Sequence, residues 1–392
     1  MRQESVGVAV IGAGMAGRAH AAGYRGASTV FDAERPEVRL VAIADVNQSL
    51  REDVCRRYDF ARSEPNWETI VSAGDIDAVS VVVANDLHRE MVEALLAAGK
   101  HVLCEKPLAP STVDAEAMAA AAEKSGLVAA AGFTYRRSPA ISAIRDEVTG
   151  GRLGDVLHFS GRAWFDYALE SSAPITWRYK GGPGSGVLAD VGSHLVDVAE
   201  FICGPITKIT GGAVATVIGE RPVPAGPTVG HAPAPLTDIR APVENEDIAT
   251  FTARFASGAL GTFSASRVAH CRPDGLGFEV FCADGSAAFD LHRLSEFIIS
   301  DRSPGASVNG PRRVLIGPQH PYVTLGLPID SAGVGHGTAD LFIYQARAFL
   351  DEIAGIEALP RCASFAEAVH GMRVLDAVVG SAARDGSAVA IG

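Results

Sequence analysis

Short apolar runs alternate with amphipathic stretches from the N-terminus to Gly132. Five runs are apolar almost throughout, which predicts strands buried on both faces: Val6–Ile11, Val38–Ala44, Ala78–Ala84, His101–Cys104 and Val128–Gly132. Four stretches between them have helical periodicity: Met15–Tyr24, Gln48–Tyr58, His88–Ala98 and Thr112–Lys124. This β-α-β alternation predicts an α/β fold with a parallel sheet that helices cover on both faces.

The pattern changes after Gly132. A helix is predicted from Pro139, a residue suited to the first helical position, to Val148. Turn signals then join strands into two predicted hairpins: Asp247–Phe255 with Leu260–Val268, and Phe278–Cys282 with Ala287–Leu291. Hairpin strands pair antiparallel, so we expect a second domain built on an antiparallel sheet. The predicted domains are residues 1–134 and 135–392.

Other segments complete the predicted organisation. Ser111 is the expected N-cap of the helix that follows it, with Asp114 at the third position. The remaining expectations are loops at Arg221–Pro235, which holds five prolines, and at Asp301–Pro311, an insertion at Arg25–Glu37, and closing helices at Ala339–Ala354 and Ser364–Ala383.

Composition narrows the class of protein. The 392 residues carry a formal net charge of −12, which argues against a general nucleic-acid surface. Six cysteines are scattered without Cys-x-x-Cys spacing, a pattern that favours reduced thiols and a cytoplasmic location. We expect no targeting segment and no membrane span, because the chain lacks a basic leader and any apolar run of sufficient length.

A glycine loop follows the first predicted strand. Gly12-Ala13-Gly14-Met15-Ala16-Gly17 has the spacing of a dinucleotide fingerprint and precedes a helix, whose N-terminal N–H groups suit a pyrophosphate. Gly12 permits the turn, Gly14 the approach of the phosphates, and Gly17 the packing of helix on strand. Asp45 ends the second strand, where a carboxylate accepts from ribose hydroxyls and repels a 2′-phosphate. The predicted cofactor is therefore NAD rather than NADP.

Polar residues follow two later strands at their carboxyl ends, where ligands of doubly wound sheets lie. Ala84, Asn85 and His88 are candidate cofactor contacts, although His88 equally fits a helix start without a role. Glu105 and Lys106 precede Pro107, which favours an extended backbone at Lys106. A lysine at this position can stabilise a developing alkoxide, but alone it equally suits an ordinary surface residue.

A second polar segment comes after the glycine-rich stretch 181–186. Asp190 is a good N-cap for a helix from Val191 to Cys203, and Asp190, His194 and Asp197 fall within about 60° of one another on a helical wheel. Histidine suits general-base work on an alcohol, and a carboxylate one turn away can orient it. A solvated polar stripe stays an alternative. We expect no metal, because a third zinc ligand is not evident.

Together these motifs resemble the Gfo/Idh/MocA family of oxidoreductases. The resemblance rests on the glycine loop, on Asn85 to His88, on Glu105-Lys106-Pro107 and on Asp190-x-Gly192-x-His194-x-x-Asp197. It extends to Gly132-Phe133-x-Tyr135-Arg136-Arg137, Trp177-Arg178 and Val374-Leu375-Asp376-Ala377. Within the family the chain is most similar to bacterial levoglucosan-type sugar dehydrogenases, through segments 85–88, 221–226 and 317–321.

The resemblance implies a Rossmann domain followed by an α+β domain with a large, open, mostly antiparallel sheet. It implies a catalytic set of Lys106, Asp190 and His194, and NAD-dependent oxidation of a sugar, anhydrosugar or inositol-like polyol. Family members often form dimers or tetramers through the open sheet, so a homo-oligomer is expected. Candidate substrate contacts are Tyr135, Arg136, Trp164, Trp177, Arg178 and Asp197, with Tyr344 and Gln345 as weaker ones.

Three other functions compete with this prediction. Some relatives cleave glycosides by transient oxidation with tightly held NAD, which yields no net NADH. Others are NAD-sensing regulators that have lost the chemistry, although the presence of Lys106 and His194 speaks against that role here. The third is a two-domain α/β protein whose ligand is not a dinucleotide.

Overall fold

The computed structural model describes residues 5–31, 36–226, 234–301, 310–324 and 331–392. It contains two compact units, Met1–Arg137 with Gly317–Val369 and Ser138–Ile316 with His370–Gly392. The predicted domain ranges, 1–134 and 135–392, stay a prediction. Packing adds one feature that the sequence did not indicate: residues 317–369 return to the first unit.

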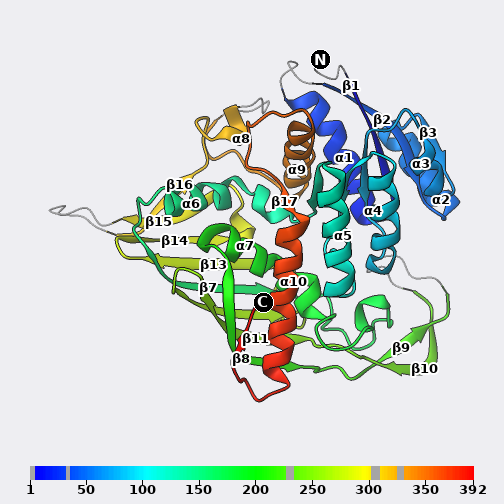
Figure 1. Ribbon diagram of the computed structural model, residues 1–392. Coiled ribbons are helices and arrows are strands. Elements are labelled where there is room, and N and C mark those ends of the chain that lie inside the picture. The colour runs from blue at the N-terminus through cyan, green and yellow to red at the C-terminus, as the bar shows by residue number, and fades with distance from the viewer. Residues whose placement is uncertain (1–4, 32–35, 227–233, 302–309, 325–330) are drawn as a thin grey trace. The chain divides into compact units, whose positions relative to one another are not determined.

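The first unit is built on a seven-stranded sheet with the order β17-β6-β5-β4-β1-β2-β3. Figure 1 labels β1, β2, β3 and β17 of this sheet. Its strands are β1 (Ser5–Ile11), β2 (Glu37–Ala44), β3 (Arg62–Glu64), β4 (Ala78–Val81), β5 (His101–Cys104), β6 (Ala129–Ala131) and β17 (Ala363–Ser364). All neighbours pair parallel except β17, which is antiparallel to β6. The order from β3 to β6 is that of a Rossmann fold, and it reverses between β1 and β4. The predicted parallel sheet is therefore confirmed.

Helices follow the strands as the periodicity predicted. They are α1 (Met15–Val30), α2 (Gln48–Tyr58), α3 (Glu68–Ser72), α4 (His88–Ala97), α5 (Thr112–Ser125), α8 (Pro321–Thr324) and α9 (Thr338–Ile353), with 3₁₀ turns at Asn85–Leu87 and Thr134–Arg137. The α4 and α5 helices pack together, as do α1 and α9. The cap of α5 is confirmed, because the Ser111 hydroxyl accepts the Asp114 N–H at 3.1 Å.

The helix predicted over Met15–Tyr24 continues to Val30, so α1 includes the first residues of the stretch Arg25–Glu37 that was interpreted as an insertion. Gly23 and Gly26 of this helix let α9 approach closely, since a Cβ on Gly23 would lie 2.6 Å from the Phe342 carbonyl oxygen and one on Gly26 would lie 2.7 Å from Ile343 Cδ1. Residues 32–35 of the predicted insertion lie outside the described residues.

The second unit contains a nine-stranded sheet with the order β16-β15-β14-β13-β7-β12-β11-β8-β18. Its strands are β7 (Val156–Trp164), β8 (Ile206–Ala215), β11 (Ile248–Phe255), β12 (Leu260–Ser266), β13 (Gly275–Cys282), β14 (Gly285–Asp290), β15 (Glu296–Asp301), β16 (Arg312–Leu315) and β18 (Val389–Ala390). The pairing is antiparallel except between β7 and β12. Both predicted hairpins and the mostly antiparallel sheet are confirmed.

Helices α6 (Pro139–Thr149) and α7 (Ser193–Cys203) pack together, and α7 lies against β7. The last helix, α10 (Phe365–Ala382), begins in the first unit and ends in the second. Gly161 of β7 makes room for α7, because a Cβ there would lie 2.8 Å from Leu195 Cδ1. Phenylalanine rings of β7, β12 and β13 build the core beside it, with Phe159 5.5 Å from both Phe263 and Phe278 between ring centroids.

The predicted loop Arg221–Pro235 is wrong at its start, where Arg221–Pro224 belong to a strand, whereas its end at Pro235 agrees with the structure. Strands β9 (Glu220–Pro224) and β10 (Leu236–Pro242) form a separate two-stranded sheet, and residues 227–233 between them lie outside the described residues. Proline is tolerated in such strands because each has one unpaired edge. Residues 302–309 of the other predicted loop also lie outside the described residues, and Asp301 belongs to β15.

Candidate functional site

The glycine loop has the geometry that a dinucleotide requires. Gly12 has φ +110°, and a Cβ there would lie 2.6 Å from the Val82 carbonyl oxygen. A Cβ on Gly17 would collide with the Gly12 carbonyl oxygen, whereas one on Gly14 would meet nothing within 4 Å. Two glycines therefore serve packing, and the third leaves open space at the start of α1.

The N-terminus of α1 carries neither a side-chain cap nor an acidic residue in its first turn. Its first N–H groups and the positive end of the helix dipole suit a pyrophosphate. The residues at this position, Ala13 and Gly14 before the helix and Met15, Ala16 and Gly17 within it, thus fit the phosphates of NAD.

Asp45 links the glycine loop to the end of β2. Its Oδ2 accepts the Ala13 N–H and its Oδ1 accepts the Asn47 N–H, each at 2.7 Å. Each carboxylate oxygen can accept more than one hydrogen bond, so ribose hydroxyls can still bind here. Asp45 therefore holds the loop in shape in addition to its predicted role as a ribose contact.

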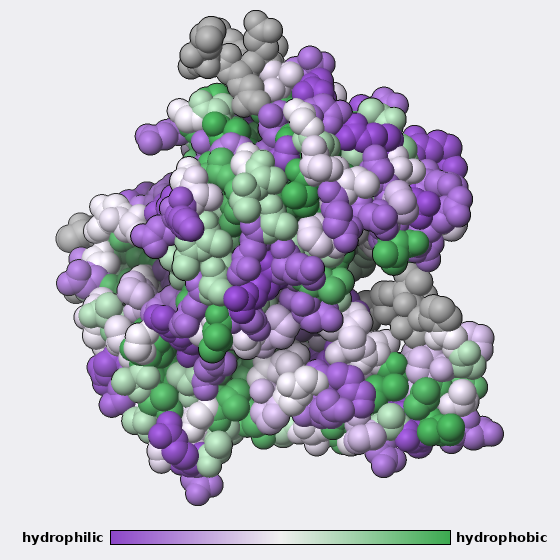
Figure 2. Space-filling view, turned by 45° about the vertical axis from the view of Figure 1, so that its right-hand side comes forward, coloured by the Kyte–Doolittle hydropathy of each residue, from purple (hydrophilic) through white to green (hydrophobic). Residues whose placement is uncertain are grey.

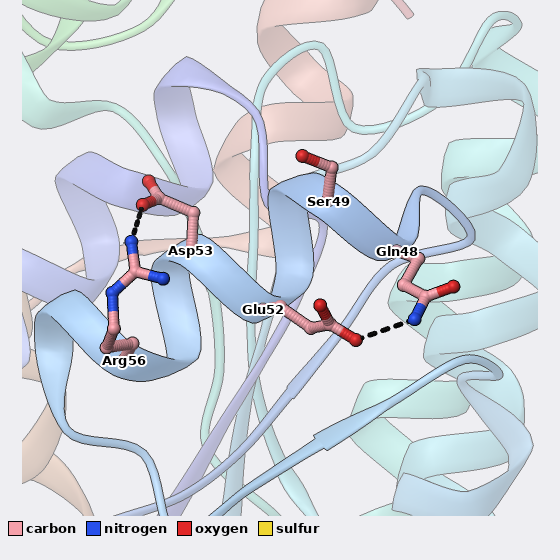
Figure 3. Close-up of a pocket in the computed structure, with 5 residues that line it drawn as sticks. All are labelled: Gln48, Ser49, Glu52, Asp53 and Arg56. Carbon is pink, nitrogen blue, oxygen red and sulfur yellow. Dashed lines mark hydrogen bonds and ion pairs between the residues drawn. The ribbon is translucent and has the colours of Figure 1, made fainter.

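A shallow surface pocket lies along α2, just after Asp45 (Figure 3). Its polar side chains bond to one another, since Arg56 pairs with Asp53 at 2.5 Å and Gln48 donates to Glu52 at 2.8 Å. Two further arginines of α2 lie close by, because Arg57 also pairs with Asp53, at 3.4 Å, and Arg51 Nη1 donates to the Asp45 carbonyl oxygen at 3.3 Å. The charge beside Asp45 is therefore mixed, and the preference for NAD over NADP stays a prediction.

Beyond β4, the chain turns through Asn85–Leu87 into α4. Ala84 is exposed and Asn85 half-buried at this carboxyl edge. His88 is buried, with Nδ1 3.2 Å from the Leu108 carbonyl oxygen and Nε2 3.2 Å from that of Val83. Burial lowers the pKa of His88, so its ring stays neutral at pH 7. The ring lies between the backbone segments of Val83 and Leu108.

Glu105 and Lys106 follow β5 at the same edge, two strands from the glycine loop. The Lys106-Pro107 peptide is cis. One oxygen of Glu105 accepts the Lys106 N–H at 3.1 Å, and the other lies 3.0 Å from Nε2 of His20, a buried residue of α1. The sequence did not single out His20, although its i, i+4 spacing to Tyr24 places both on the face of α1 that meets the sheet.

In the second unit, a single π-helical turn, Leu188–Gly192, leads directly into α7. The predicted N-cap role of Asp190 is therefore wrong, because the backbone is already helical there. A π-turn inside a helix often marks a functional site, since it redirects side chains that a regular helix would space evenly. His194 and Asp197 are buried on α7, at 9% and 6% exposure, which excludes the solvated polar stripe.

Tyr167 contacts this segment directly. Its hydroxyl donates to Asp190 Oδ2 at 2.6 Å. Burial, together with the Asp190 carboxylate, raises the pKa of Tyr167 well above its ordinary value, so the phenol stays a donor. The sequence did not reveal this residue, because no motif spacing connects it to Asp190; its only signal is an aromatic residue shortly after β7.

The polar run Glu244-Asn245-Glu246-Asp247 organises the loops around Asp190. Glu246 accepts N–H groups of Gly184 at 2.8 Å and of Gly186 and Leu188 at 3.1 Å. It thereby supplies a carboxylate to the N-terminus of the π-turn, where negative charge is favourable.

Its neighbours fix adjoining segments. Asn245 donates to the carbonyl oxygens of Arg178 and Lys180, and Asp247 forms a fully buried ion pair with Arg267 at 2.8 Å. Arg267 in turn lies 4.8 Å from the Tyr179 ring centroid. These contacts place the chain that leads into the π-turn.

The predicted substrate residues of this unit differ in their surroundings. Trp164 is partly buried in β7 and donates to Ser264 at 3.0 Å. Trp177 is 57% exposed, with the Arg178 guanidinium 4.4 Å from its ring centroid. Trp177 therefore presents an open aromatic face, which suits a sugar C–H surface better than the partly covered ring of Trp164 does.

The remaining substrate candidates belong to the first unit. Tyr135 is half-buried, whereas Arg136 is buried and pairs with Glu367 at 2.9 Å. Burial alone would raise the pKa of Glu367, but Arg136 and hydrogen bonds from Ser364 lower it to about 2. Tyr344 and Gln345 are fully buried. The structure thus engages Arg136 in an internal ion pair, and the substrate roles stay predictions.

Family models cover most of the chain. A model described as oxidoreductase family, NAD-binding Rossmann fold, named GFO_IDH_MocA, matches residues 6–133. The model of a GFO/IDH/MocA C-terminal domain matches residues 141–288. Both matches agree with the sheets observed in the two units.

Similar proteins cover between three quarters and nearly all of the chain. Levoglucosan dehydrogenase of Pseudarthrobacter phenanthrenivorans is 34% identical, with 97% of each chain covered. Myo-inositol 2-dehydrogenase of Thermotoga maritima is 27% identical over 75% of this chain and 78% of its own. A levoglucosan dehydrogenase solved with NADH superposes with a TM-score of 0.89 at 31% identity, covering 99% of each chain. These findings confirm the resemblance, the fold class and NAD as the cofactor.

The surface adds one negative finding. None of the helices in the described part of the chain combines the length and apolar character that crossing a bilayer requires. On the face drawn in Figure 2, hydrophilic and hydrophobic residues are interspersed.

Proposed function

Because the chain belongs to the Gfo/Idh/MocA family of NAD-binding oxidoreductases, we propose that it oxidises a secondary hydroxyl of a sugar, anhydrosugar or inositol-like polyol. The observation that carries the proposal is the position of Lys106. It follows β5 at the carboxyl edge of the sheet that also bears the glycine loop and Asn85. Ligands of such sheets bind at this edge, where the strand order reverses.

The proposed mechanism divides the work among three side chains. NAD, when bound, accepts the hydride. The Lys106 ammonium donates a hydrogen bond to the substrate oxygen and stabilises its developing negative charge. His194 takes the hydroxyl proton, and Asp190 orients the substrate or the imidazole.

Tyr167 supports the role of Asp190. A carboxylate that accepts a hydrogen bond from a phenol is held in one orientation, and its charge is stabilised. The π-turn and the Glu246 carboxylate fix the backbone on which Asp190 lies. These contacts fix the orientation of Asp190, which supports its proposed role beside His194 in proton transfer.

The substrate class comes from the relatives. Levoglucosan dehydrogenase matches over nearly the whole chain, and D-glucoside 3-dehydrogenase of Escherichia coli and myo-inositol 2-dehydrogenase match over parts of it. We therefore expect a cyclic polyhydroxyl compound, and levoglucosan is the first substrate to test.

The test is an absorbance assay at 340 nm with NAD and a panel of levoglucosan, glucosides, inositols and free pyranoses. We expect NADH to accumulate with at least one compound. Release of an aglycone without net NADH would replace the proposal by glycoside cleavage. Binding of NAD without turnover of any panel member would favour an NAD-sensing role.

Substitutions test the assignment of residues. Lys106→Ala and His194→Ala should each lower kcat by about 10²–10⁴-fold, the range for positioned acid–base groups. NAD affinity should survive the His194 change. An unchanged rate in either variant would remove that residue from the mechanism.

A further inference from the structure

A buried chain of hydrogen bonds crosses the first unit beneath Lys106. The Tyr24 hydroxyl lies 2.8 Å from Ser80 Oγ, which lies 3.0 Å from His20 Nδ1. His20 Nε2 lies 3.0 Å from Glu105 Oε1, and Glu105 Oε2 accepts the Lys106 N–H at 3.1 Å. Tyr24, Ser80 and His20 are at most 3% exposed. The chain of bonds therefore runs from the interior of α1 to the backbone of the proposed catalytic lysine.

One arrangement of protons satisfies every member of this chain. An ionised Glu105 only accepts, so His20 Nε2–H donates to it. The other ring nitrogen of a neutral imidazole then accepts from the Ser80 hydroxyl, and Ser80 accepts from Tyr24. Burial raises the pKa of Tyr24, which keeps the phenol protonated as the terminal donor. With the direction reversed, the Tyr24 hydrogen would have no hydrogen-bond acceptor within the described ranges.

Packing leaves Glu105 few other positions. A Cβ on Gly132 would lie 2.7 Å from Glu105 Oε1, so the carboxylate rests directly against the β6 end. The His20 ring also contacts Phe342 of α9 edge to face, with 5.5 Å between ring centroids. The bond between His20 and Glu105 is therefore built into the core rather than formed at the surface, and its geometry reaches Lys106 through one residue.

We propose that His20 is a positioning residue that orients Lys106 through the Glu105 carboxylate. This inference rests on the proposed catalytic role of Lys106. Its functional part is the Nε2–Glu105 bond, because only that bond leads toward the lysine. The links to Ser80 and Tyr24 fix the tautomer of the ring and contribute mainly to folding.

Two substitutions separate these links. The amide nitrogen of Gln reaches about as far as Nε2 and can donate to Glu105, whereas the side-chain oxygen of Asn reaches about as far as Nδ1 and can accept from Ser80. His20→Gln therefore retains a donor toward Glu105, and His20→Asn retains only the link to Ser80. Tyr24→Phe is the control that removes the distal hydroxyl and leaves the Glu105 bond in place.

The first readout needs no substrate. Hydrogen–deuterium exchange of a peptide spanning residues 104–108 reports the Lys106 N–H. We expect exchange to accelerate about tenfold or more in His20→Asn and to stay within about threefold of wild type in His20→Gln and Tyr24→Phe. Equal protection in the Asn and Gln variants would overturn the proposal. Nitrogen NMR of the wild-type imidazoles should show His20 as the neutral Nε2–H tautomer; an Nδ1–H tautomer would also overturn it.

The second readout is kinetic. His20→Asn should lower kcat about 10- to 100-fold with NAD affinity within about threefold, while His20→Gln stays near wild type. A merely structural role would lower the melting temperature of both variants and leave their kcat values alike, which would refute positioning. If no panel compound reduces NAD, the proposed function fails, whereas the exchange of the Lys106 amide still decides whether His20 orients this residue.

Discussion

Removal of the Glu246 carboxylate should loosen the segment that carries Asp190 and His194. Glu246 is 2% exposed and accepts three backbone N–H groups, those of Gly184, Gly186 and Leu188. In Glu246→Ala all three lose their acceptor. Gly184 is partly exposed and regains water, but Gly186 and Leu188 are buried.

The expected magnitude follows from these two buried donors. Each unsatisfied N–H costs about 1–3 kcal/mol, so Glu246→Ala should lower the free energy of unfolding by about 2–6 kcal/mol. Glu246→Gln keeps one oxygen for Gly186 and Leu188, loses the charge and the Gly184 bond, and should cost about 1–3 kcal/mol. With a urea dependence of about 3 kcal/mol per M, the Ala variant should unfold at least about 0.7 M earlier.

A neighbouring carboxylate provides the matched control. Glu244 also accepts from this loop, from Lys180 Nζ at 2.8 Å and from Gly181 N–H at 3.0 Å, but its side chain is 44% exposed. Exposed pairs contribute about 0–1 kcal/mol, so Glu244→Ala should shift the midpoint little.

Urea unfolding followed by fluorescence measures the free energy of unfolding. Hydrogen exchange of residues 184–192 shows whether the loss of stability lies in this segment. Glu246→Ala should expose these amides and lower kcat while NAD affinity is kept, because the glycine loop belongs to the other unit. Equal midpoints for the Glu246 and Glu244 variants, or unchanged exchange in this segment, would refute the reasoning.

Three further substitutions test other parts of the molecule. Asp45→Ala removes the acceptor of the Ala13 N–H and the carboxylate that is proposed to bind the ribose. Loss of a hydrogen bond between ligand and a charged group costs about 1.5–3 kcal/mol, so calorimetry should show NAD binding about 10- to 150-fold more weakly and a smaller preference over NADP; an unchanged preference would contradict the role of Asp45. Tyr167→Phe removes the hydrogen bond to Asp190 and should lower kcat about tenfold or more without weakening NAD binding, and an unaltered kcat would show that the bond is dispensable. The lowered pKa of Glu367 stabilises the fold above its ordinary value of 4.5, and this contribution is lost as the pH falls toward about 2. Glu367→Gln should therefore destabilise the protein at pH 7 and much less at pH 2.5; an equal urea-midpoint difference at the two pH values would disprove this.

The apolar pattern predicted the first sheet well because its strands are buried on both faces. The runs at Val6–Ile11 and His101–Cys104 correspond to β1 and β5 almost residue for residue. The sequence pattern failed at positions where a glycine or proline is explained by tertiary contacts rather than by a helix end or a loop. Gly23 and Gly26 serve the packing of α1 against α9, and Pro222 and Pro224 occupy a two-stranded sheet with free edges. A single sequence does not distinguish these uses from helix ends and loops.

In the candidate site, too, some features could be predicted from the sequence and others could not. The glycine loop was predictable because its spacing and the helix after it are neighbours in the chain, whereas the bond from Ala13 to Asp45 spans 32 positions and was not predicted. The contacts of Tyr167 with Asp190 and of His20 with Glu105 were not predictable, since they join residues 23 and 85 positions apart. The π-turn could not be predicted either, because the sequence 188–192 fits the start of a regular helix equally well.

The burial of polar residues accounts for most of the structural features that the hydrophobic pattern did not predict. Asn245, Glu246 and Asp247 are three consecutive polar residues, yet they are at most 2% exposed. Hydrophobicity predicts burial only for groups that water does not solvate strongly, whereas these three are buried because backbone N–H groups and Arg267 satisfy them. Such partners exist only once the loops have met. The same condition makes these positions sensitive, because removal of one partner leaves the others buried and unsatisfied. Substitutions in the run 245–247 should therefore impair the segment of Asp190 more than equally conservative changes in the apolar face of α7 do.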